Sequence, residues 1–535
     1  MTEDMDGKTI IVNGRAVLGI ELGSTRIKAV LLDEGLVSLA HGSHSWENKF
    51  VDGLWTYSLD DVWAGLQDCY ANLRRDVMEK YGVEITRLRA VGFSGMMHGY
   101  LPFDKDGRQL AAFRTWRNTN TAEAAAELKE LLEFNIPLRW SISHLYQAVL
   151  DGEEHVADIS YITTLAGYVH WKLTGKRVIG VGEASGMFPI DPETKDYDSA
   201  MVAKFDDMMA RREYRWRLRD ILPTVLCAGD DAGTITAEGA RLLDPSGNLQ
   251  PGTVTCPPEG DAGTGMVATN AVRPRTGNVS CGTSSFSMIV LEHNLKHHYP
   301  SIDIVTTPDG WPVAMVHCNN CTSDINAWVD VFRQGLELFG CDADTGTLFT
   351  KLFNVALEGE ADCGGLLSYN FYSGEPVVAL AEGHPMVMRF VNGKFSLANL
   401  MRSHLYGAVA VLKVGNDILL NDEHVALDKL TGHGGFFNTP LVGQKILTAV
   451  FGTPITVMKS AGEGGAWGIA LLAAYSVDKK DGQHLADYLD EKVFAGNEGV
   501  TLAPDKAEVE DFNRYYKSWI EGLDMERAAS NVSNR

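Results

Sequence analysis

The sequence predicts an α/β protein made of two related domains, and three observations lead to this prediction. The chain has 535 residues, more than one hydrophobic core usually serves, so two domains of roughly 250 residues each are expected. Short apolar runs alternate with longer segments whose apolar residues recur at helical spacing, which is the pattern of strands and amphipathic helices. One strand-turn-strand unit occurs twice, once in each half of the chain.

The first copy of this unit is residues 17–33, VLGIELGSTRIKAVLLD. Two apolar runs flank a turn at Gly23, Ser24 and Thr25, so we expect a β-hairpin. Such a turn exposes backbone N–H groups and two hydroxyls, which together suit a phosphate group. Glu21 is placed to hold an accompanying Mg²⁺, directly or through water. From this segment alone, an ordinary surface hairpin is an equally good interpretation.

The second copy is residues 276–292, TGNVSCGTSSFSMIVLE. Placing Gly23 on Gly282 aligns the two turns residue by residue. At the same offset the other aligned pairs are Ser24 with Thr283, Thr25 with Ser284, and Asp33 with Glu292. Similarity at a fixed offset indicates a duplicated unit. Two phosphate-type hairpins predict a nucleotide held between two related domains.

Composition narrows the function classes. The formal net charge of -23 would repel a polyanionic backbone, so we expect no nucleic-acid partner. The opening MTEDMDGK is acidic and contains no apolar core of a signal peptide, and no apolar run reaches about 18 residues, so neither a secretory signal nor a membrane span is expected. The eight cysteines are scattered in the way of reduced cytoplasmic thiols. Among them Cys318 and Cys321 form a Cys-x-x-Cys, which we expect to pack rather than bind metal.

The first half of the chain continues with strands and helices. Residues 41–57 are expected to form β structure with a turn at Asp52 and Gly53, and Ser58 is placed to cap a long amphipathic helix. Residues 89–93 predict a short strand that leads into Met97, His98 and Gly99. Because ligands bind at the carboxyl ends of strands in α/β sheets, His98 is expected to face a site. A hydrogen-bonded structural histidine is the alternative.

Residues 113–118, FRTWRN, precede a predicted helix over 121–132. Trp116 can stack on the apolar face of a sugar, while Arg117 and Asn118 bond its hydroxyls. Trp116 is equally well interpreted as a core residue. Residues 162–174 are expected to be a buried helix without a site.

Asp261 lies in Pro-Pro-Glu-Gly-Asp-Ala-Gly-Thr-Gly, residues 257–265. The neighbouring glycines allow its carboxylate to approach a ligand closely, and a helix predicted to begin near Ala262 would place it at a positive helix end. Such a carboxylate can accept the proton of a hydroxyl nucleophile. A helix N-cap is the alternative function of Asp261.

The second half is expected to add a strand over 311–317 and helices over 324–339 and 399–420. In residues 430–438, LTGHGGFFN, the glycines would let an adenine ring lie flat against bare backbone. A helix should begin near residue 444 and end before residue 452. The glycine-rich residues 462–468 lead into a helix over 469–475, which we interpret as structural.

Five segments of the chain follow one another in the order of a known family, and the chain resembles the FGGY carbohydrate kinases, a branch of the actin-like ATPase superfamily. VLGIELGSTRIKAVL and GNVSCGTSS resemble the family's two phosphate motifs, and GFSGMMHGYLPFD its pentulose-binding segment. PPEGDAGTGM is similar to the segment of the catalytic aspartate, and GHGGFFN with AGEGGAWGIALLAA to the adenosine segment and final helix. The resemblance extends from about residue 17 to about residue 475.

The resemblance implies two ribonuclease-H-like domains, each a mixed sheet flanked by helices, with an interdomain cleft that closes over MgATP and a sugar. Residues 1–270 would form the sugar-binding domain and residues 271–535 the nucleotide-binding domain. Asp261 would be the general base and would also contact the sugar. The other implied sugar contacts are Met97, His98, Gly99, Trp116, Arg117 and Asn118. The implied contacts with ATP are Gly23, Ser24, Thr25, Lys28, Gly282, Thr283, Ser284, Gly434, Gly435 and Asn438, with Glu21 on Mg²⁺.

Two departures from the family pattern bear on the substrate. Glu21 stands where the family usually has Asp, and Trp116 is followed by Arg117 and Asn118 instead of the usual Asn-Asp. We expect an ATP-dependent kinase of the terminal hydroxyl of a ketopentose, of the xylulokinase or ribulokinase type. A kinase of glycerol or a hexonate, a non-catalytic sugar sensor, and an actin- or chaperone-like ATPase are the alternatives. The sequence leaves the oligomeric state open, and a homodimer is compatible with it.

Overall fold

The computed structural model describes residues 7–212, 214–458, 464–496 and 499–529. The chain divides into two compact units, the first made of residues 1–272, 304–313 and 463–496, and the second of residues 273–303, 314–462 and 497–535. The chain thus returns twice to the first unit, which the expected boundary near residue 270 did not anticipate. The acidic opening residues 1–6 and residues 461–463 of the last glycine-rich motif lie outside the described residues.

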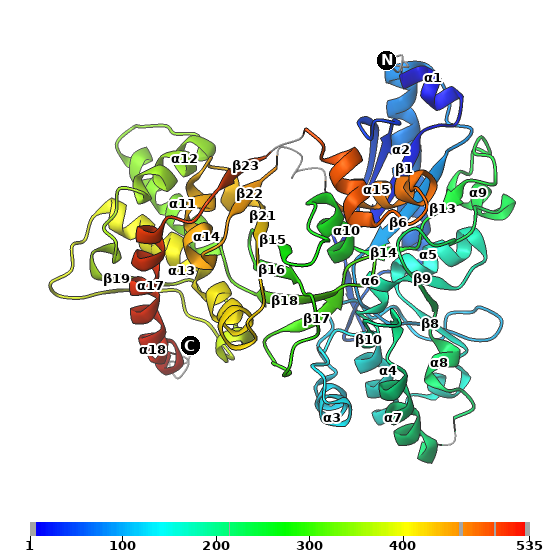
Figure 1. The fold of residues 1–535 in the computed structure, drawn as a ribbon, viewed down its shortest axis with the longest axis horizontal. Coiled ribbons are helices and arrows are strands. Elements are labelled where there is room, and N and C mark those ends of the chain that lie inside the picture. The colour runs from blue at the N-terminus through cyan, green and yellow to red at the C-terminus, as the bar shows by residue number, and fades with distance from the viewer. Residues whose placement is uncertain (1–6, 213, 459–463, 497–498, 530–535) are drawn as a thin grey trace. The chain divides into compact units, whose positions relative to one another are not determined.

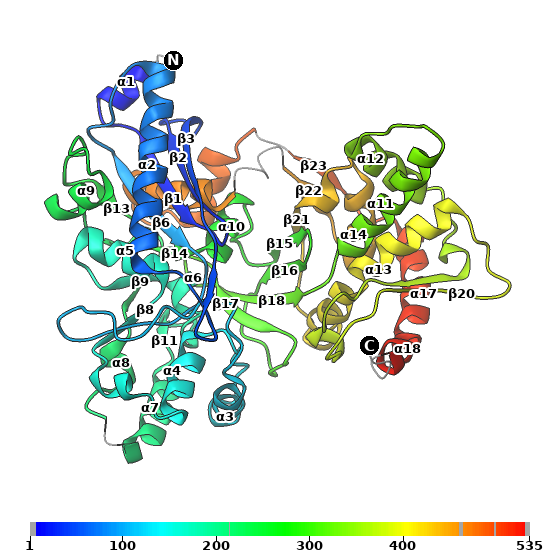
Figure 2. The ribbon, with the colours of Figure 1, turned by 180° about the vertical axis from the view of Figure 1, so that it is seen from behind.

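The first unit contains a mixed sheet with the strand order β13-β6-β1-β2-β3, and β14 also pairs with β6 (Figure 1 and Figure 2). The central strand β1 pairs antiparallel with β2 and parallel with β6, which confirms the predicted first hairpin. The strands are β1 (Val17–Leu22), β2 (Arg26–Leu32), β3 (Ser38–Ser45), β6 (Ala90–Gly95), β13 (Val254–Thr255) and β14 (Glu259–Gly260).

Two long helices cover opposite faces of this sheet. Helix α15 (Gly464–Asp478) lies in front of the sheet in Figure 1, and α2 (Leu59–Tyr81) lies in front of it in Figure 2. The predicted cap is confirmed, because the Ser58 side chain accepts a hydrogen bond from the Asp61 N–H. The close approach of α15 requires glycine at position 19, where a Cβ atom would lie 2.1 Å from the Ala466 carbonyl oxygen.

The first unit has a second hydrophobic core, which is built from buried residues between Tyr100 and Leu222. The predicted helix over 162–174 begins at Leu165, because residues 161–163 pair with β7 instead. Further elements of the first unit are α1 (Gly7–Val12), β4 (Lys49–Val51), β5 (Leu54–Thr56), β7 (Leu101–Phe103), α3 (Ala122–Leu132), α4 (Ser141–Leu150), β8 (Tyr161–Thr163), α5 (Leu165–Thr174), β9 (Val178–Gly180), α6 (Val181–Ala184), β10 (Ile190–Asp191), β11 (Asp196–Tyr197), α7 (Ser199–Met209), α8 (Leu218–Ile221), β12 (Thr224–Leu226), α9 (Ala237–Leu243), α10 (Asp261–Ala268) and α16 (Leu485–Tyr488).

The sheet of the second unit includes the strand order β18-β16-β15-β21-β22-β23. Strand β15 pairs antiparallel with β16 and parallel with β21, and β21 pairs parallel with β22. The strands are β15 (Thr276–Cys281), β16 (Ser285–Val290), β18 (Pro312–Cys318), β21 (Lys429–His433), β22 (Ile455–Val457) and β23 (Val500–Leu502). Strand β17 (Asp303–Thr306) precedes β18, and most of its residues belong to the first unit.

The pairing of β15 repeats the pairing of β1, which supports the predicted duplication. The two turns differ in length, however. Leu22 pairs with Ile27 in the first hairpin, whereas Cys281 pairs with Ser285 in the second. The second turn is therefore one residue shorter, and the predicted equivalence of Asp33 and Glu292 is wrong by one position.

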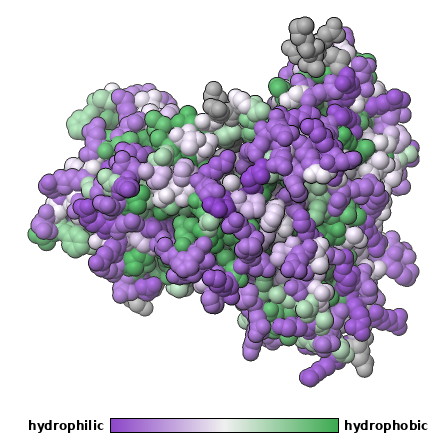
Figure 3. All heavy atoms as spheres, in the orientation of Figure 1, coloured by the Kyte–Doolittle hydropathy of each residue, from purple (hydrophilic) through white to green (hydrophobic). Residues whose placement is uncertain are grey.

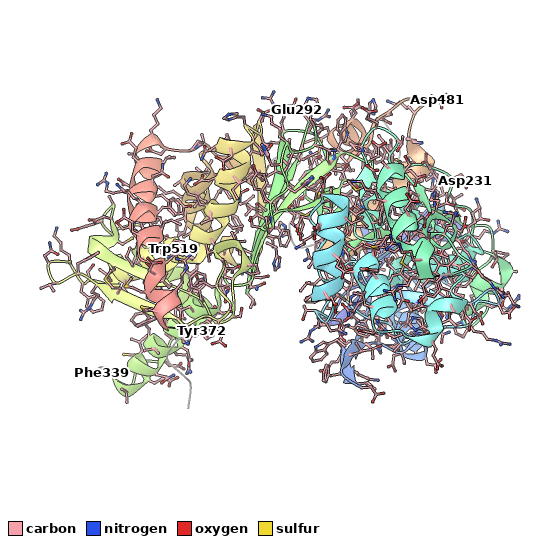
Figure 4. All side chains as sticks on the ribbon, turned by 90° about the horizontal axis from the view of Figure 1, so that it is seen from below. Asp231, Glu292, Phe339, Tyr372, Asp481 and Trp519 are labelled. Atoms are coloured by element: carbon pink, nitrogen blue, oxygen red, sulfur yellow. The ribbon has the colours of Figure 1, made fainter. Side chains whose placement is uncertain are left out.

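The second unit also contains a small two-stranded sheet of β19 and β20, and helices α13 and α17 contact β19. On α17, the buried Trp519 ring lies 5.5 Å from that of Tyr369, and its indole N–H donates to the Ser368 carbonyl at 3.0 Å (Figure 4). The elements are α11 (Ser323–Leu338), α12 (Thr345–Ala356), β19 (Leu366–Tyr369), β20 (Met386–Arg389), α13 (Leu397–Asp417), α14 (Val442–Phe451), α17 (Lys506–Glu521) and α18 (Leu523–Ala529).

Hydrophilic residues cover most of the face drawn in Figure 3. Over the described ranges, none of the helices combines the length and the apolar character that a bilayer crossing needs.

Candidate active site

Asp261 is the first residue of α10, directly after β14, where the sequence predicted a ligand-facing carboxylate. Its Oδ1 accepts a hydrogen bond from the Met97 N–H at 3.2 Å. The side chain is reachable by solvent, yet protein surrounds it closely enough that loss of hydration raises its pKa. The N–H groups of Met97 and Ala262 lower that pKa again. The result is an accessible, fixed carboxylate that takes a proton more readily than a free aspartate.

Met97, His98 and Gly99 follow β6, whose neighbouring strand β14 leads into Asp261. His98 and Gly99 both have left-handed backbone, with φ of 70° and 103°, a conformation that is costly for a histidine. The His98 ring is buried, and its Nδ1 lies 3.2 Å from the Gly186 carbonyl oxygen. Burial and the nearby Arg139 hold its pKa well below the ordinary value. The imidazole is therefore neutral with the proton on Nδ1, and Nε2 is left as an acceptor.

Residues 116–118 form the Trp116 loop, in which Trp116 and Arg117 are exposed and Asn118 is buried. Trp116 is 39% exposed, so it is not a core residue. The Arg117 guanidinium lies 3.7 Å from the centre of the Trp55 ring. Asn118 is buried. Its amide accepts from the Trp55 N–H at 2.9 Å and donates to the Trp55 carbonyl at 2.8 Å and to the Thr115 carbonyl at 3.0 Å. Because both amide protons are used by backbone, we interpret Asn118 as a residue that fixes this loop to β5 and not as a sugar contact.

Glu21 and Lys28 face each other as a cross-strand pair of β1 and β2. Burial and the negative charge of Asp261 raise the pKa of Glu21, while Lys28 lowers it. Because the charge of Asp261 raises the proton affinity of Glu21, a divalent cation beside these two carboxylates is stabilising. Mg²⁺ commonly takes one or two protein carboxylates and keeps several waters, so Glu21 and Asp261 fit it. Across the part of the chain that the structure describes, no cluster of three or more His, Cys, Asp or Glu residues is arranged to bind a metal.

Hydrogen bonds to backbone carbonyl groups fix the tip of the first hairpin. Gly23 donates its N–H to the Arg26 carbonyl at 3.1 Å, and Trp46 and Tyr57 donate to the carbonyl groups of Gly23 and Ser24. Thr25 and Lys28 are exposed. The predicted phosphate-binding residues of the first half thus lie on one accessible turn and the strand that follows it.

In the second unit, the turn Gly282 to Ser284 and the predicted adenosine segment lie together. Strands β15 and β21 are parallel neighbours, and a Cβ atom at position 434 would lie 2.5 Å from the Cys281 carbonyl oxygen. Gly434 has a φ of 99°, so only glycine fits this contact without strain. Gly435 and Asn438 are exposed beside it. The structure therefore brings these two predicted nucleotide segments together within one unit.

Two buried acids next to Asp261 were missed by the sequence analysis. Both carboxylate oxygens of Glu259 accept backbone hydrogen bonds, from Gly182 at 3.2 Å and from Glu183 at 2.9 Å, and burial raises its pKa to about 8. Glu183 is fully buried, and burial, Asp261 and Glu259 raise its pKa well above the ordinary value. Glu259 could have been noticed within Pro-Pro-Glu-Gly-Asp, but nothing local marks Glu183.

The comparisons with known proteins match both halves of the chain. The model of the N-terminal domain of the FGGY family of carbohydrate kinases matches residues 16–245, and the model of its C-terminal domain matches residues 277–477. The chain belongs to the FGGY family of carbohydrate kinases. It is therefore a sugar kinase, an enzyme with a small-molecule sugar as substrate.

Individual members of the FGGY family are distant from this chain. A xylulose kinase of Haemophilus influenzae is 21% identical over 447 residues, covering 82% of this chain and 84% of that protein. A xylulose kinase of Lactococcus lactis is 20% identical over 94% of this chain and 95% of its own length. Among solved structures, a xyloylose kinase from Brucella ovis has a TM-score of 0.76 at 17% identity, covering 96% of this chain and 99% of that one. A gluconate kinase from Lactobacillus acidophilus has a TM-score of 0.77 at 17% identity, covering 97% and 98%.

Proposed function

We propose that this FGGY kinase transfers the γ-phosphoryl group of ATP to the terminal hydroxyl of a ketopentose of the xylulose or ribulose class. The observation that carries the proposal is the Asp261 carboxylate, which is accessible, fixed by the Met97 N–H and placed beside the loop of His98. The names of the curated relatives, which include xylulose kinases, favour a ketopentose over other sugars.

In the proposed reaction, Asp261 accepts the proton of the sugar hydroxyl as that oxygen bonds to the γ-phosphorus. The bond between this phosphorus and the β,γ-bridging oxygen breaks, and ADP leaves with the electron pair. The raised pKa of Asp261 strengthens it as a base, and a positioned base of this kind typically contributes roughly 10² to 10⁴ in rate. Phosphoryl transfer otherwise depends mainly on positioning and on neutralising the phosphate oxygens.

For the sugar, we propose contacts with Met97, His98, Gly99, Trp116 and Arg117. The neutral His98 offers Nε2 as an acceptor for a sugar hydroxyl, because its Nδ1 proton is used by Gly186. Trp116 has an exposed indole face that can stack on the sugar ring or chain. Asn118 is omitted because its amide is bound to backbone.

For the donor, we propose that the two hairpin turns and Lys28 bind the phosphates of ATP, and that Gly434, Gly435 and Asn438 bind its nucleoside. Glu21, with Asp261 nearby, would hold Mg²⁺, which supplies positive charge to the phosphate oxygens when it is bound. On this assignment the region of residues 1–270 binds the sugar and contributes its hairpin turn, Lys28 and Glu21 to MgATP, whereas the region of residues 271–535 binds the rest of the nucleotide. The ribonuclease-H-like classification of both domains belongs to the same proposal and is supported by the repeated pairing of β1 and β15.

The test is ADP release in a coupled assay with D- and L-xylulose, D- and L-ribulose, glycerol and gluconate. We expect a ketopentose to give the highest kcat/KM. A higher value for glycerol or gluconate would favour the second candidate, a kinase of another polyol or sugar acid, which glycerol and gluconate kinases among the similar proteins support. Sugar binding without ADP release would instead indicate a sensor.

A further inference from the structure

Three successive carbonyl groups at the tip of the first hairpin are all bound by one short stretch of the chain. The Trp46 indole N–H donates to the Gly23 carbonyl at 2.7 Å, and the Tyr57 hydroxyl donates to the Ser24 carbonyl at 2.5 Å. The backbone N–H of Trp46 donates to the Thr25 carbonyl at 3.2 Å. The phosphate-type turn is therefore not a free loop but is tied down on its carbonyl side.

This arrangement fixes the direction of the N–H groups of the turn. In a trans peptide, the C=O of one residue and the N–H of the next point in opposite directions. Because the Gly23 and Ser24 carbonyls point toward Trp46 and Tyr57, the N–H groups of Ser24 and Thr25 point away from them. Two N–H groups directed to the same side are what an anion-binding turn requires.

The residues that hold the turn are themselves rigid. Tyr57 and Trp46 are 1% and 8% exposed, and their ring centres lie 4.3 Å apart. Burial raises the pKa of Tyr57 to about 12, so its hydroxyl stays protonated and keeps donating in any physiological buffer. Two residues earlier, the backbone of Trp55 is fixed on both sides by Asn118. Through Trp55, the segment that contains Trp46 and Tyr57 is therefore fixed to the Trp116 loop.

The second hairpin shows the same device built from other groups. The Gly282 carbonyl accepts from the Thr322 N–H at 3.0 Å and from the Thr322 hydroxyl at 2.8 Å, and the Thr283 carbonyl accepts from the Cys321 N–H at 2.9 Å. The N–H groups of Thr283 and Ser284 therefore also point away from the segment that holds the turn. In the first hairpin, the side chains of Trp46 and Tyr57 bind the carbonyls of Gly23 and Ser24. In the second hairpin, the backbone of Cys321 and the backbone and hydroxyl of Thr322 bind the equivalent carbonyls. Because different groups make equivalent hydrogen bonds in both units, we infer that these bonds serve the turns and are not accidents of packing.

We propose that Trp46 and Tyr57 are positioning residues for phosphoryl transfer, which orient the Ser24 and Thr25 N–H groups toward the phosphates of the donor by binding the carbonyls behind them. This inference rests on the proposed function, because it takes ATP as the ligand of the hairpin. A role in folding alone is the competing explanation, and the two differ in what they predict for ATP and for the sugar.

The test is Tyr57→Phe, which removes one hydroxyl and keeps the ring that packs on Trp46. The matched control is Tyr81→Phe, because the Tyr81 hydroxyl also donates to a backbone carbonyl of the same unit, that of Leu39 at 3.3 Å, on α2 and away from the turn. We expect Tyr57→Phe to raise the KM for ATP by about threefold to tenfold relative to the control, as expected for loss of one hydrogen bond that orients a binding group. The KM for the sugar should stay within about twofold and the melting temperature should match that of the control.

A second variant protects the test against misfolding of the first. Thr322→Val removes the hydroxyl that holds Gly282 in the other hairpin and should also raise the KM for ATP selectively. The inference is overturned if a folded Tyr57→Phe keeps the KM for ATP of the control, or if the constants for ATP and sugar rise together with a fall in melting temperature. If Tyr57→Phe does not fold, an unchanged KM for ATP in Thr322→Val overturns it. Wild-type protein without sugar-dependent ADP release would refute the proposed function instead, before any variant is compared.

Discussion

Replacing Asp261 by Asn separates the chemistry of this site from its architecture. The two side chains have nearly the same shape, and the Asn Oδ1 can accept the same Met97 N–H that Asp261 accepts at 3.2 Å. The variant therefore keeps the loop that carries Met97 and His98 in place, while it loses the group that takes the proton. We expect sugar binding to be largely retained and turnover to collapse.

The structure allows both effects to be sized. Loss of a negative charge in the first turn of α10 costs about 0.3–1 kcal/mol of stability, and this loss is offset because partial loss of hydration makes the charge of Asp261 itself unfavourable, as its raised pKa shows. We therefore expect a net change within about 1 kcal/mol. A lost general base removes roughly 10² to 10⁴ in rate, which corresponds to about 2.7 to 5.4 kcal/mol of activation free energy. The kinetic effect should exceed the effect on stability.

The assay is kcat for ADP release with the best sugar, together with the sugar dissociation constant from calorimetry and the melting temperature. Asp198→Asn is the matched control, since Asp198 caps α7 of the same unit by accepting the Met201 N–H at 2.9 Å. We expect the control to keep near-normal kcat. An Asp261→Asn enzyme with turnover close to wild type would remove Asp261 from the proton-transfer step and refute the reasoning.

Three further predictions follow from the same structure. Folding raises the pKa of Glu259 to about 8, so folded Glu259 keeps a proton that the unfolded chain releases near pH 4.5. The free energy of unfolding should therefore fall as the pH rises from about 5 to about 8, by at most about 1.4 kcal/mol per pH unit. Urea denaturation of Glu259→Gln should lack this contribution, and the same dependence of the free energy of unfolding on pH in the variant and the wild type would contradict the prediction. Asn118→Ala should lower the free energy of unfolding by about 1–3 kcal/mol, because the Trp55 backbone loses its hydrogen-bond partners. The KM for the sugar should stay unchanged in the folded enzyme. A selective rise of that KM in a fully stable variant would instead make Asn118 a sugar contact. Glu21→Gln should raise the Mg²⁺ concentration that gives half-maximal activity while the KM for the sugar stays constant, and an unaltered Mg²⁺ titration would exclude Glu21 as a metal-binding residue.

The hairpins and their glycines were predictable because their signals are local. Apolar runs on either side of Gly23 and Gly282 determine strand, turn and strand over fewer than about twenty residues, and the duplication made the interpretation firmer. The error of one position between Asp33 and Glu292 arose because a turn can lose a residue while both flanking strands keep their patterns.

Other features depend on contacts between distant parts of the chain, which composition and spacing do not encode. Asn118 has the residue type of a sugar ligand, but its partner Trp55 lies 63 residues earlier. The buried environment of Glu183 and Glu259 forms only when α6 packs against β14, which brings together residues 76 positions apart. The return of residues 463–496 to the first unit is also a product of tertiary packing, since a helix such as α15 carries no local sign of which sheet it covers.

The central claim is that Asp261 activates a sugar hydroxyl for attack on ATP. The most direct test is to incubate the wild type and Asp261→Asn with MgATP and the best ketopentose, and to quantify ADP and sugar monophosphate in the same sample by mass spectrometry. We expect the wild type to form the two products in equal amounts, with the phosphate on the terminal carbon, and the variant to form neither at a comparable rate. ADP formed without sugar phosphate, or equal product formation by both proteins, would contradict the claim.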